Sequence, residues 1–316
     1  MNPYCSVAYR SLFSSSSAFA ALTDYEITNC WTQHGLQGPL IHFFSNKVTS
    51  NRCTITAPGF TFDAGKLAAD APVLLEVLSQ MLRNQEGYIQ CLNELSLYGE
   101  MVTVNHEVVA NSRTSFFIPI AGSGAEQIQV MARDSRTRLR KLIRERSSYR
   151  LIELKSIEHA IILGDLYKAL ADRQNFSPHY VFRGKEVFEP FLDSEKWNLF
   201  GVIDESQQVI GGCLCCLHTS YRQLDYVFTM YEPDKPFLGR LIPYLLTEWV
   251  RNFSSGSEIS YLALGGGIYE NDPLARFKRS LGGEARELTS LKFYSKYGSN
   301  LLERRLYYNN RWPQIE

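Results

Sequence analysis

The chain has 316 residues, of which 45% are hydrophobic and 13% are aromatic. These values are typical of a chain that buries a hydrophobic core, and they exclude disordered, collagen-like and low-complexity proteins. Lys plus Arg and Asp plus Glu both number 33, so the formal net charge is zero. A protein that binds nucleic acid usually carries a basic excess, so any site for a polyanion must here be a local patch.

The first part of the chain predicts a small α/β unit. Residues 1–30 show little periodicity, and we expect them to form an N-terminal segment outside the first domain. The following elements are expected next: strands over residues 39–44 and 52–56 that pair as a hairpin, a helix over 70–84 with apolar residues on one face, and strands over 88–92 and 114–120. We therefore place a first domain at residues 31–132.

A basic segment joins the two halves of the chain. Residues 133–150 contain eight Lys or Arg and two acidic residues. Leu139, Leu142 and Ile143 form a narrow apolar stripe, which predicts a helix that packs on one side. Its charged side is either a solvated basic surface or a surface that faces a polyanion.

The second half predicts a mixed sheet with helices on both faces, and we place a second domain at residues 151–316. The predicted fold class is therefore α/β, with a mixed sheet of parallel and antiparallel strands of the kind also found in α+β proteins. The predicted elements, in chain order, are a strand over 149–154, helices over 156–174 and 184–192, a hairpin of 198–203 with 209–217, a strand over 223–231, a helix over 240–253, a strand over 259–264, a helix over 273–281 and a strand over 287–294. This order is also the succession found in the GNAT acetyltransferase superfamily.

Several kinds of catalytic or cofactor site are excluded by motif. The sequence has no phosphate-binding loop G-x-x-x-x-G-K-[ST], no G-x-G-x-x-G after a strand, no H-E-x-x-H and no G-x-S-x-G. Its six histidines lie far apart, so no local spacing indicates a metal site. The seven cysteines are odd in number, and three of them fall in one apolar run, which favours free buried thiols and a reducing cytoplasm. No apolar run reaches the ~20 residues that span a bilayer.

The segment over residues 261–283 is the strongest candidate for a site. A buried strand runs into Gly265, Gly266 and Gly267, where the backbone can approach a ligand closely. Asp272 precedes Pro273 and is placed to cap the next helix. That helix carries Phe277 toward the core and Lys278 on a different side. Ligands of open α/β sheets bind outside the carboxyl ends of strands. The alternative is an ordinary strand–loop–helix connection with a surface lysine.

The same segment resembles the signature of the FemAB-like acyltransferases. The resemblance rests on L-G-G-G, a short spacer, D-P-L-A-R-F-K and L-G-G. These proteins are GNAT-fold relatives typified by the Fem aminoacyltransferases that build peptidoglycan cross-bridges. Residues 135–144 resemble the helix between the family's two domains, and residues 166–176 resemble its first-helix motif. Residues 226–231 occupy the place of its aromatic acceptor-contact strand.

The resemblance implies two tandem GNAT-like domains, joined by the helix of residues 133–150, with the site in the second domain. It implies transfer of an acyl or aminoacyl group from an activated ester or thioester to an amine. By matching position, Lys278 would stabilise negative charge on the transferred carbonyl, and Arg173 would contact an acidic or phosphorylated part of a substrate. Tyr226, Tyr231 and Phe277 would line the acceptor channel. The general base is left open between Asp272, Tyr226 and a water molecule.

Two donors follow from this resemblance. The first hypothesis is an N-acyltransferase that uses acyl-CoA or a similar thioester, with a small-molecule amine, an amino sugar or a cell-surface precursor as acceptor. The alternative uses aminoacyl-tRNA, bound through the basic helix between Arg136 and Arg144, with a peptidoglycan or natural-product precursor as acceptor. Either donor would be a co-substrate, with no tightly bound cofactor, and no DNA partner is expected. A third hypothesis keeps the fold as a binding module without catalysis.

Overall fold

The computed structural model describes residues 7–15, 19–21, 44–46, 55–57, 88–91, 108–145, 148–176, 180–218, 222–253, 259–266 and 272–294. The chain forms two compact units. Unit 1 comprises Met1–Arg113, Pro178–Tyr180 and Glu287–Glu316, and unit 2 comprises Thr114–Ser177 and Val181–Arg286. The helix predicted over residues 70–84 lies outside the described residues. The domain boundaries predicted from the sequence stay predictions.

Unit 1 is described through short elements. They are the helix α1 (Val7–Ser14) and the strands β1 (Phe19–Ala21), β2 (Phe44–Asn46), β3 (Ile55–Ala57) and β4 (Tyr88–Cys91). Strands β2 and β3 pair antiparallel with Phe44 opposite Thr56, which confirms the predicted pairing of these two segments. Helix α1 and strand β1 lie within residues 1–30, where the weak periodicity predicts no element.

Unit 2 contains a mixed sheet in the order β11-β5-β10-β9-β8-β7-β6. Its strands are β5 (Val108–Pro119), β6 (Arg150–Glu153), β7 (Trp197–Ile203), β8 (Val209–His218), β9 (Gln223–Tyr231), β10 (Tyr261–Gly266) and β11 (Glu284–Tyr294), of which β5 and β11 also contribute residues to unit 1. Strands β6 to β9 pair antiparallel in succession, β10 pairs antiparallel with β5, and β9 pairs parallel with β10. The predicted mixed α/β sheet is thereby confirmed.

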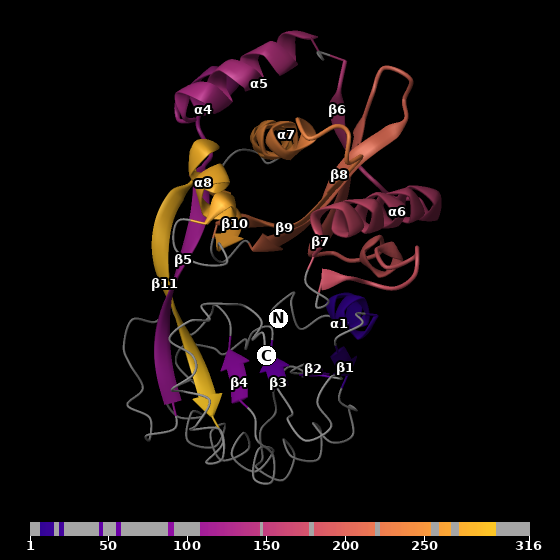
Figure 1. Ribbon diagram of the computed structural model, residues 1–316. Helices are drawn as coiled ribbons and strands as arrows, with labels where there is room; N and C mark the ends of the chain where they lie inside the picture. Colours follow the sequence, from indigo (N-terminus) through magenta and orange to yellow (C-terminus); the bar gives the residue numbers. More distant parts are fainter. Residues whose placement is uncertain are drawn as a thin grey trace. The chain divides into compact units, whose positions relative to one another are not determined.

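Helices cover both faces of this sheet (Figure 1). They are α4 (Gly124–Gln129), α5 (Arg133–Glu145), α6 (Ile157–Gln174), α7 (Leu238–Phe253) and α8 (Pro273–Ser280). Helix α7 packs on β6, β8, β9 and β10, whereas α6 packs on β7, β8 and β9. Helices α4 and α5 pack against α7 on its side away from the sheet. None of the described helices is long and apolar enough to cross a lipid bilayer.

The core on the α7 side consists of aliphatic side chains from the helix and the sheet. Leu238, Leu241, Ile242 and Leu246 of α7 are each at most 2% exposed. They belong to one cluster with buried residues of β7, β8 and β10. Each such side chain contributes about 1.5–3 kcal/mol to stability when it is fully buried. This packing holds α7 firmly on the sheet.

The core on the α6 side is aromatic. Tyr167 of α6 stacks on Phe182, with ring centroids 5.4 Å apart, and makes edge-on contacts with Phe188 and with Phe228 of β9. The helix begins after Ser156, whose side chain accepts a hydrogen bond from the backbone of His159. Helix α6 therefore has the predicted extent and packs against the predicted sheet.

The helix predicted over residues 184–192 is wrong. Only a single 3-10 turn, η4 (Glu189–Phe191), forms in this region. Gly184 has φ +95°, which a right-handed helix cannot include, and Pro190 lacks the N–H that a helix interior needs. The apolar residues that suggested the helix, such as Phe188 and Phe191, are instead buried from an irregular segment.

Candidate functional site

The site of unit 2 is built around a split between two neighbouring parallel strands. Strands β9 and β10 pair only over a short stretch, where Gln223–Asp225 lies beside Tyr261–Ala263. Beyond that point β10 stays with β5, whereas β9 stays with β8 as far as Tyr231. The two strands therefore separate at their carboxyl ends, which is where open α/β sheets bind ligands.

A β-bulge lies on each side of this split. The β8–β9 register advances by one residue on β8 and two on β9, which leaves Val227 without an opposite residue. In the same way, Leu264 is the extra residue where β10 pairs with β5. The next residue, Gly265, has φ +68°, a left-handed conformation that glycine adopts easily. Bulges bend strands and are frequent beside active sites, and here they accompany the separation of β9 and β10.

Lys278 reaches the end of β10 from helix α8. Its Nζ atom donates a hydrogen bond to Gly266 O at a distance of 2.6 Å, and the side chain is half-buried. The structure thus brings together Lys278 and Gly266, two of the candidates from the sequence, with Gly265 beside them. Gly267 lies outside the described residues. An ammonium group held at this place can stabilise an oxyanion that forms nearby.

Asp272 caps helix α8, as the sequence predicts. Its side chain accepts a hydrogen bond from the backbone N–H of Ala275, and the residue is 1% exposed. Pro273 follows at the first helical position. This cap fixes the start of the helix that carries Lys278. A role for Asp272 as general base stays a prediction.

Tyr226 projects from β9 to the α7 side of the sheet, where it packs against the cluster that contains Cys213 and Cys215. Burial raises the pKa of the Tyr226 phenol well above its usual range, and the two thiols act in the same direction. The nearby Thr229 hydroxyl lowers this pKa by a smaller amount. The phenol therefore keeps its proton at neutral pH, which favours a hydrogen-bond donor over a general base at this position.

Tyr231 and Phe277, two predicted lining residues, both approach Gly239 at the start of helix α7. A side chain added at Gly239 would lie 3.5 Å from Tyr231 Oη and 3.8 Å from Phe277 Cζ. The guanidinium carbon of Arg240 stands 5.3 Å from the centre of the Phe277 ring. Sequence reasoning missed Arg240. Its position directly after a glycine at the start of a helix, beside the candidate strand, was the signal that could have found it.

Arg173 lies near the same loop from the other side of the sheet. Its Nη1 atom donates a hydrogen bond to Pro233 O at 2.5 Å, in the connection between β9 and α7. The arginine is otherwise exposed at the end of α6, which closes with Asn175 in a left-handed conformation. The contact with an acidic or phosphorylated substrate stays a prediction for this residue.

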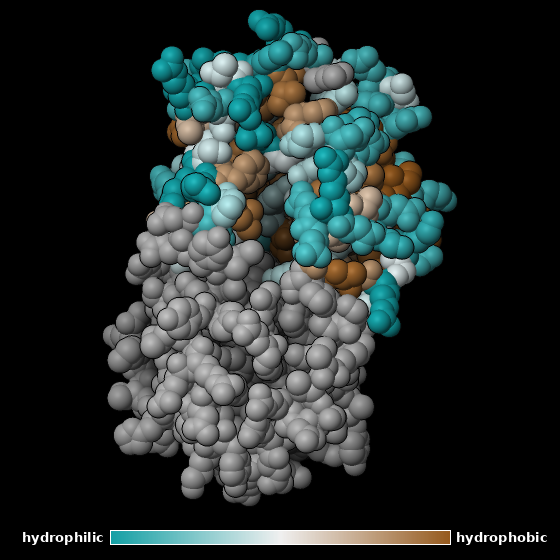
Figure 2. All heavy atoms as spheres, in the orientation of Figure 1, coloured by the Kyte–Doolittle hydropathy of each residue, from teal (hydrophilic) through white to brown (hydrophobic). Residues whose placement is uncertain are grey.

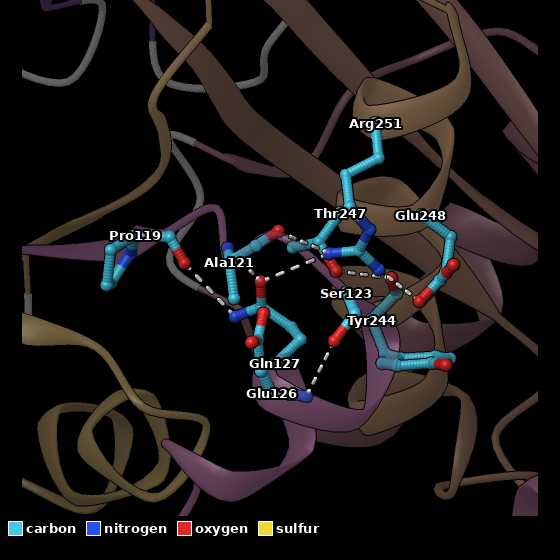
Figure 3. A network of polar contacts seen from close by, with 9 residues as sticks. All are labelled: Pro119, Ala121, Ser123, Glu126, Gln127, Tyr244, Thr247, Glu248 and Arg251. Atoms are coloured by element: carbon cyan, nitrogen blue, oxygen red, sulfur yellow. Dashed lines mark hydrogen bonds and ion pairs between the residues drawn. The ribbon is translucent and has the colours of Figure 1, made fainter. Parts of the chain in front are cut away.

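A buried polar network holds the far half of α7 in place (Figure 3). Gln127 of α4 is 0% exposed, accepts a hydrogen bond from Ala121 N at 2.9 Å and donates one to Pro119 O at 3.1 Å. Arg251 of α7 donates to Ala121 O at 3.2 Å and forms an ion pair with Glu248. The network joins the end of β5 to α7, so it fixes the helix whose other end carries Arg240.

The space-filling view shows a hollow between the region of α8 and the region of α6, with hydrophobic residues in its depth (Figure 2). This hollow lies over the part of the sheet where β9 and β10 run (Figure 1). No group of three or more His, Cys, Asp or Glu side chains that could hold a metal ion was found among the described residues.

No protein-family model and no curated protein sequence matches the chain significantly. Solved structures do match its fold. FemX superposes with a TM-score of 0.55 over 94% of this chain and 97% of its own, at 12% sequence identity. The chain has the fold of FemX.

Two further structures share this FemX-like fold. L-PGS from Bacillus licheniformis gives a TM-score of 0.54 at 11% identity, with 91% of this chain and 98% of that chain covered. The C-terminal domain of a putative lysylphosphatidylglycerol synthetase from Agrobacterium fabrum gives 0.53 at 8% identity, with 98% of both chains covered. The resemblance to FemAB-like proteins that the sequence motifs predict is thus confirmed for the fold.

Proposed function

We propose that this protein is an N-acyltransferase that forms an amide. It transfers an acyl group from an activated donor, such as an acyl thioester of coenzyme A, to the amine of a small molecule, an amino sugar or a cell-surface precursor. The observation that carries the proposal is the place of Lys278, whose Nζ lies 2.6 Å from Gly266 O beside the split between β9 and β10. We place the reaction in the cytoplasm, in keeping with the free thiols of Cys213, Cys215 and Cys216.

In the proposed reaction the acceptor amine attacks the thioester carbonyl directly. The new C–N bond forms, the C–S bond breaks, and the sulfur leaves as a thiolate. Negative charge develops on the carbonyl oxygen during the attack, and the Lys278 ammonium stabilises it from a fixed position on α8. The amine proton goes to Asp272 or to a water molecule, because the raised pKa of Tyr226 keeps that phenol protonated at neutral pH.

Aminoacyl-tRNA is the alternative donor, and one observation favours it. Helix α5 carries six basic side chains and two acidic ones, with Leu139 buried on its inner side. The basic residues are Arg133, Arg136, Arg138, Arg140, Lys141 and Arg144. A dense row of cations attracts a nucleic-acid backbone mainly through charge.

The test compares the Lys278→Ala variant with an Arg276→Ala control. Arg276 lies on the same helix but is exposed, so the control removes one charge without touching the site. Purified enzymes are supplied with labelled acetyl-CoA or labelled aminoacyl-tRNA, with and without ribonuclease, and a panel of amines. We expect Lys278→Ala to slow turnover about 10²–10³-fold, the loss typical of one oxyanion donor, while Arg276→Ala keeps the wild-type rate.

The outcomes separate the hypotheses. Loss of activity on ribonuclease treatment identifies tRNA as the donor, and ribonuclease-resistant activity with acetyl-CoA identifies the thioester. An unchanged rate for Lys278→Ala, with the variant correctly folded, would remove the proposed catalytic role. Absence of transfer by the wild type with either donor and every amine would instead favour the interpretation of the fold as a binding module.

A further inference from the structure

Most arginines of helix α5 lie in one row along the helix. Helical residues three or four apart share a face, and these arginines follow each other in steps of three, four and four residues. This arginine row consists of Arg133, Arg136, Arg140 and Arg144. By the rise of an α-helix it is about 17 Å long. The space-filling view shows hydrophilic residues over the region of α5 (Figure 2).

No ion pair neutralises the arginine row among the residues that the structure describes. Arg133, Arg140 and Arg144 are exposed, and Arg136 is half-buried. Arg136 donates a hydrogen bond to the amide oxygen of Gln129 at 2.7 Å, and this partner is neutral. The row therefore keeps its positive charge uncompensated.

The other side of the same helix has a different charge pattern. Its residues at helical spacing are two acids and two bases, namely Asp134, Arg138, Lys141 and Glu145. Lys141 Nζ lies 3.8 Å from Glu145 Oε1 in an ion pair. Alternating charges of this kind are the usual pattern of a helix side that only faces water. The purely cationic side is the exception, and it indicates an anionic partner.

An anionic lipid surface fits the arginine row. A straight row of charges meets a plane at every member, and clusters of basic side chains on a helix bind acidic lipids through their headgroups. Each guanidinium group offers a fork of N–H donors that matches a phosphate. Aliphatic side chains can enter the headgroup region of a membrane. Val130, which is 46% exposed, lies three residues before Arg133 and can do so.

A nucleic acid is the other polyanion that a row of arginines can bind. Its recognition usually adds aromatic side chains that stack on bases, or amide side chains that read base edges. Helix α5 contains no aromatic residue and no Asn or Gln, and the chain as a whole has no net positive charge. A lipid surface requires none of these features, so it accounts better for the composition of α5.

Helix α5 also contacts the helix that carries Lys278. Ser135 Oγ donates a hydrogen bond to Ser280 Oγ at 2.9 Å, and Ala132 N donates one to Ser280 O at 3.1 Å. Ser280 is the last residue of α8. The arginine row and the candidate catalytic amine therefore belong to two helices in direct contact.

We propose that the arginine row docks this protein on an anionic membrane, where its guanidinium groups bind the phosphates of acidic lipids. This inference goes beyond the proposed acyl transfer, because it concerns where the protein acts and does not require Lys278 to be catalytic. Docking would favour those acceptors of the proposed reaction that a membrane carries.

The test measures cosedimentation of the full chain with lipid vesicles. Vesicles of phosphatidylcholine and phosphatidylglycerol in equal amounts are compared with vesicles of phosphatidylcholine alone. We expect the wild type to bind only the anionic vesicles. Binding should weaken strongly when the salt concentration rises from about 0.1 M to about 1 M, because the Debye length falls from ~10 Å to ~3 Å. Equal binding to both kinds of vesicle, or no binding, would overturn the proposal.

Two double variants locate the binding surface. Arg140→Gln with Arg144→Gln removes two charges of the arginine row and should weaken binding about 25-fold, since each cation near an anionic surface contributes about fivefold. The matched control, Arg138→Gln with Lys141→Gln, removes two charges from the other side of α5. It should stay within about threefold of the wild type, because salt screens charges that lie farther from the lipid. Equal losses for the two double variants would contradict docking through the row.

A charge-preserving variant tests whether charge is what binds. Arg140→Lys with Arg144→Lys keeps both charges and should bind anionic vesicles nearly as well as the wild type. A loss as large as that of the glutamine variant would overturn the proposal. Lys278→Ala should bind vesicles like the wild type while it loses transfer activity, so a failure of the catalytic proposal and a failure of docking are distinguished.

Unacylated tRNA serves as the competing polyanion. It is titrated against the wild type and the Arg140→Gln, Arg144→Gln double variant under the same conditions. We expect this variant to lose vesicle binding. If it instead loses tRNA binding and keeps vesicle binding, the arginine row is a nucleic-acid surface and the proposal fails.

Discussion

The buried carboxylate of Asp272 accepts a hydrogen bond from the backbone N–H of Ala275 in the first turn of α8. Asn caps helices about as well as Asp does, whereas Ala does not cap them. We expect Asp272→Asn to keep both the unfolding free energy and the turnover rate close to those of the wild type. Asp272→Ala should lose about 1 kcal/mol of stability, measured by urea unfolding, because α8 loses its cap.

The Asp272→Asn variant also decides the identity of the general base. It keeps the capping oxygen and replaces the other carboxylate oxygen with an uncharged NH2 group, which cannot accept a proton at neutral pH. If turnover slows by about a hundredfold or more while stability is unchanged, the carboxylate takes the amine proton. An unchanged turnover rate would leave water as the acceptor of that proton.

Tyr226 carries a buried hydroxyl that lacks a hydrogen bond of good geometry within the described residues. An unsatisfied buried polar group costs about 1–3 kcal/mol. We therefore expect Tyr226→Phe to raise the unfolding free energy by about 1 kcal/mol in the absence of substrate. If the phenol donates a hydrogen bond to the bound substrate, the same variant raises KM, and steady-state kinetics detects it. A variant that is both less stable and unchanged in KM would contradict this prediction.

Gly212 allows β8 to approach β7 and α6 closely. A Cβ atom at this position would lie 2.1 Å from Phe200 O and 2.9 Å from a methyl group of Leu163. Since the nearest atom is backbone, the strand must shift to make room, and we expect Gly212→Ala to cost about 3 kcal/mol. The control is Gly122→Ala, at an exposed position where the nearest atom, 3.1 Å away, belongs to the flexible Glu126 carboxylate. Equal urea midpoints for the two variants would contradict the tight packing at Gly212.

Tyr244 makes stability depend on pH in the alkaline range. Burial raises the pKa of its phenol to about 12, and the neighbouring Glu248 acts in the same direction. The unfolded chain releases this proton near pH 10, so the stabilisation is fully present below about pH 10 and is lost as pH rises toward 12. In Tyr244→Phe the loss of stability between pH 10 and 12 should be smaller than in the wild type. Urea unfolding at several pH values measures both slopes, and parallel slopes would contradict the prediction.

Local sequence patterns were sufficient for the elements that depend on local signals. Helix α6 starts after a Ser cap and ends at Asn175, and the hairpin of β7 and β8 follows from two apolar runs around a polar turn. The site residues Gly265, Gly266 and Lys278 could be found because they lie within one short segment.

Features that depend on distant partners could not be predicted in this way. Gln127 is buried only because Arg251 and the end of β5 supply hydrogen-bond partners, and its own short helix has little apolar periodicity. Arg240 is similar, because its environment comes from α5 and α8, which lie roughly a hundred residues before it and more than thirty residues after it. At residues 184–192 the local pattern misled instead. The spacing of apolar residues predicted a helix, which Gly184 and Pro190 prevent.

Three thiols in the middle of unit 2 give the protein an internal reporter of opening. Cys213, Cys215 and Cys216 are all 0% exposed on β8, an interior strand between β9 and β7, and burial raises the pKa of Cys215 and Cys216 well above the usual range. A thiol reagent can modify them only when neighbouring strands part. After the other cysteines are replaced by serine, the rate of modification would measure how often the sheet opens in the intact protein, and how far a bound substrate suppresses that opening.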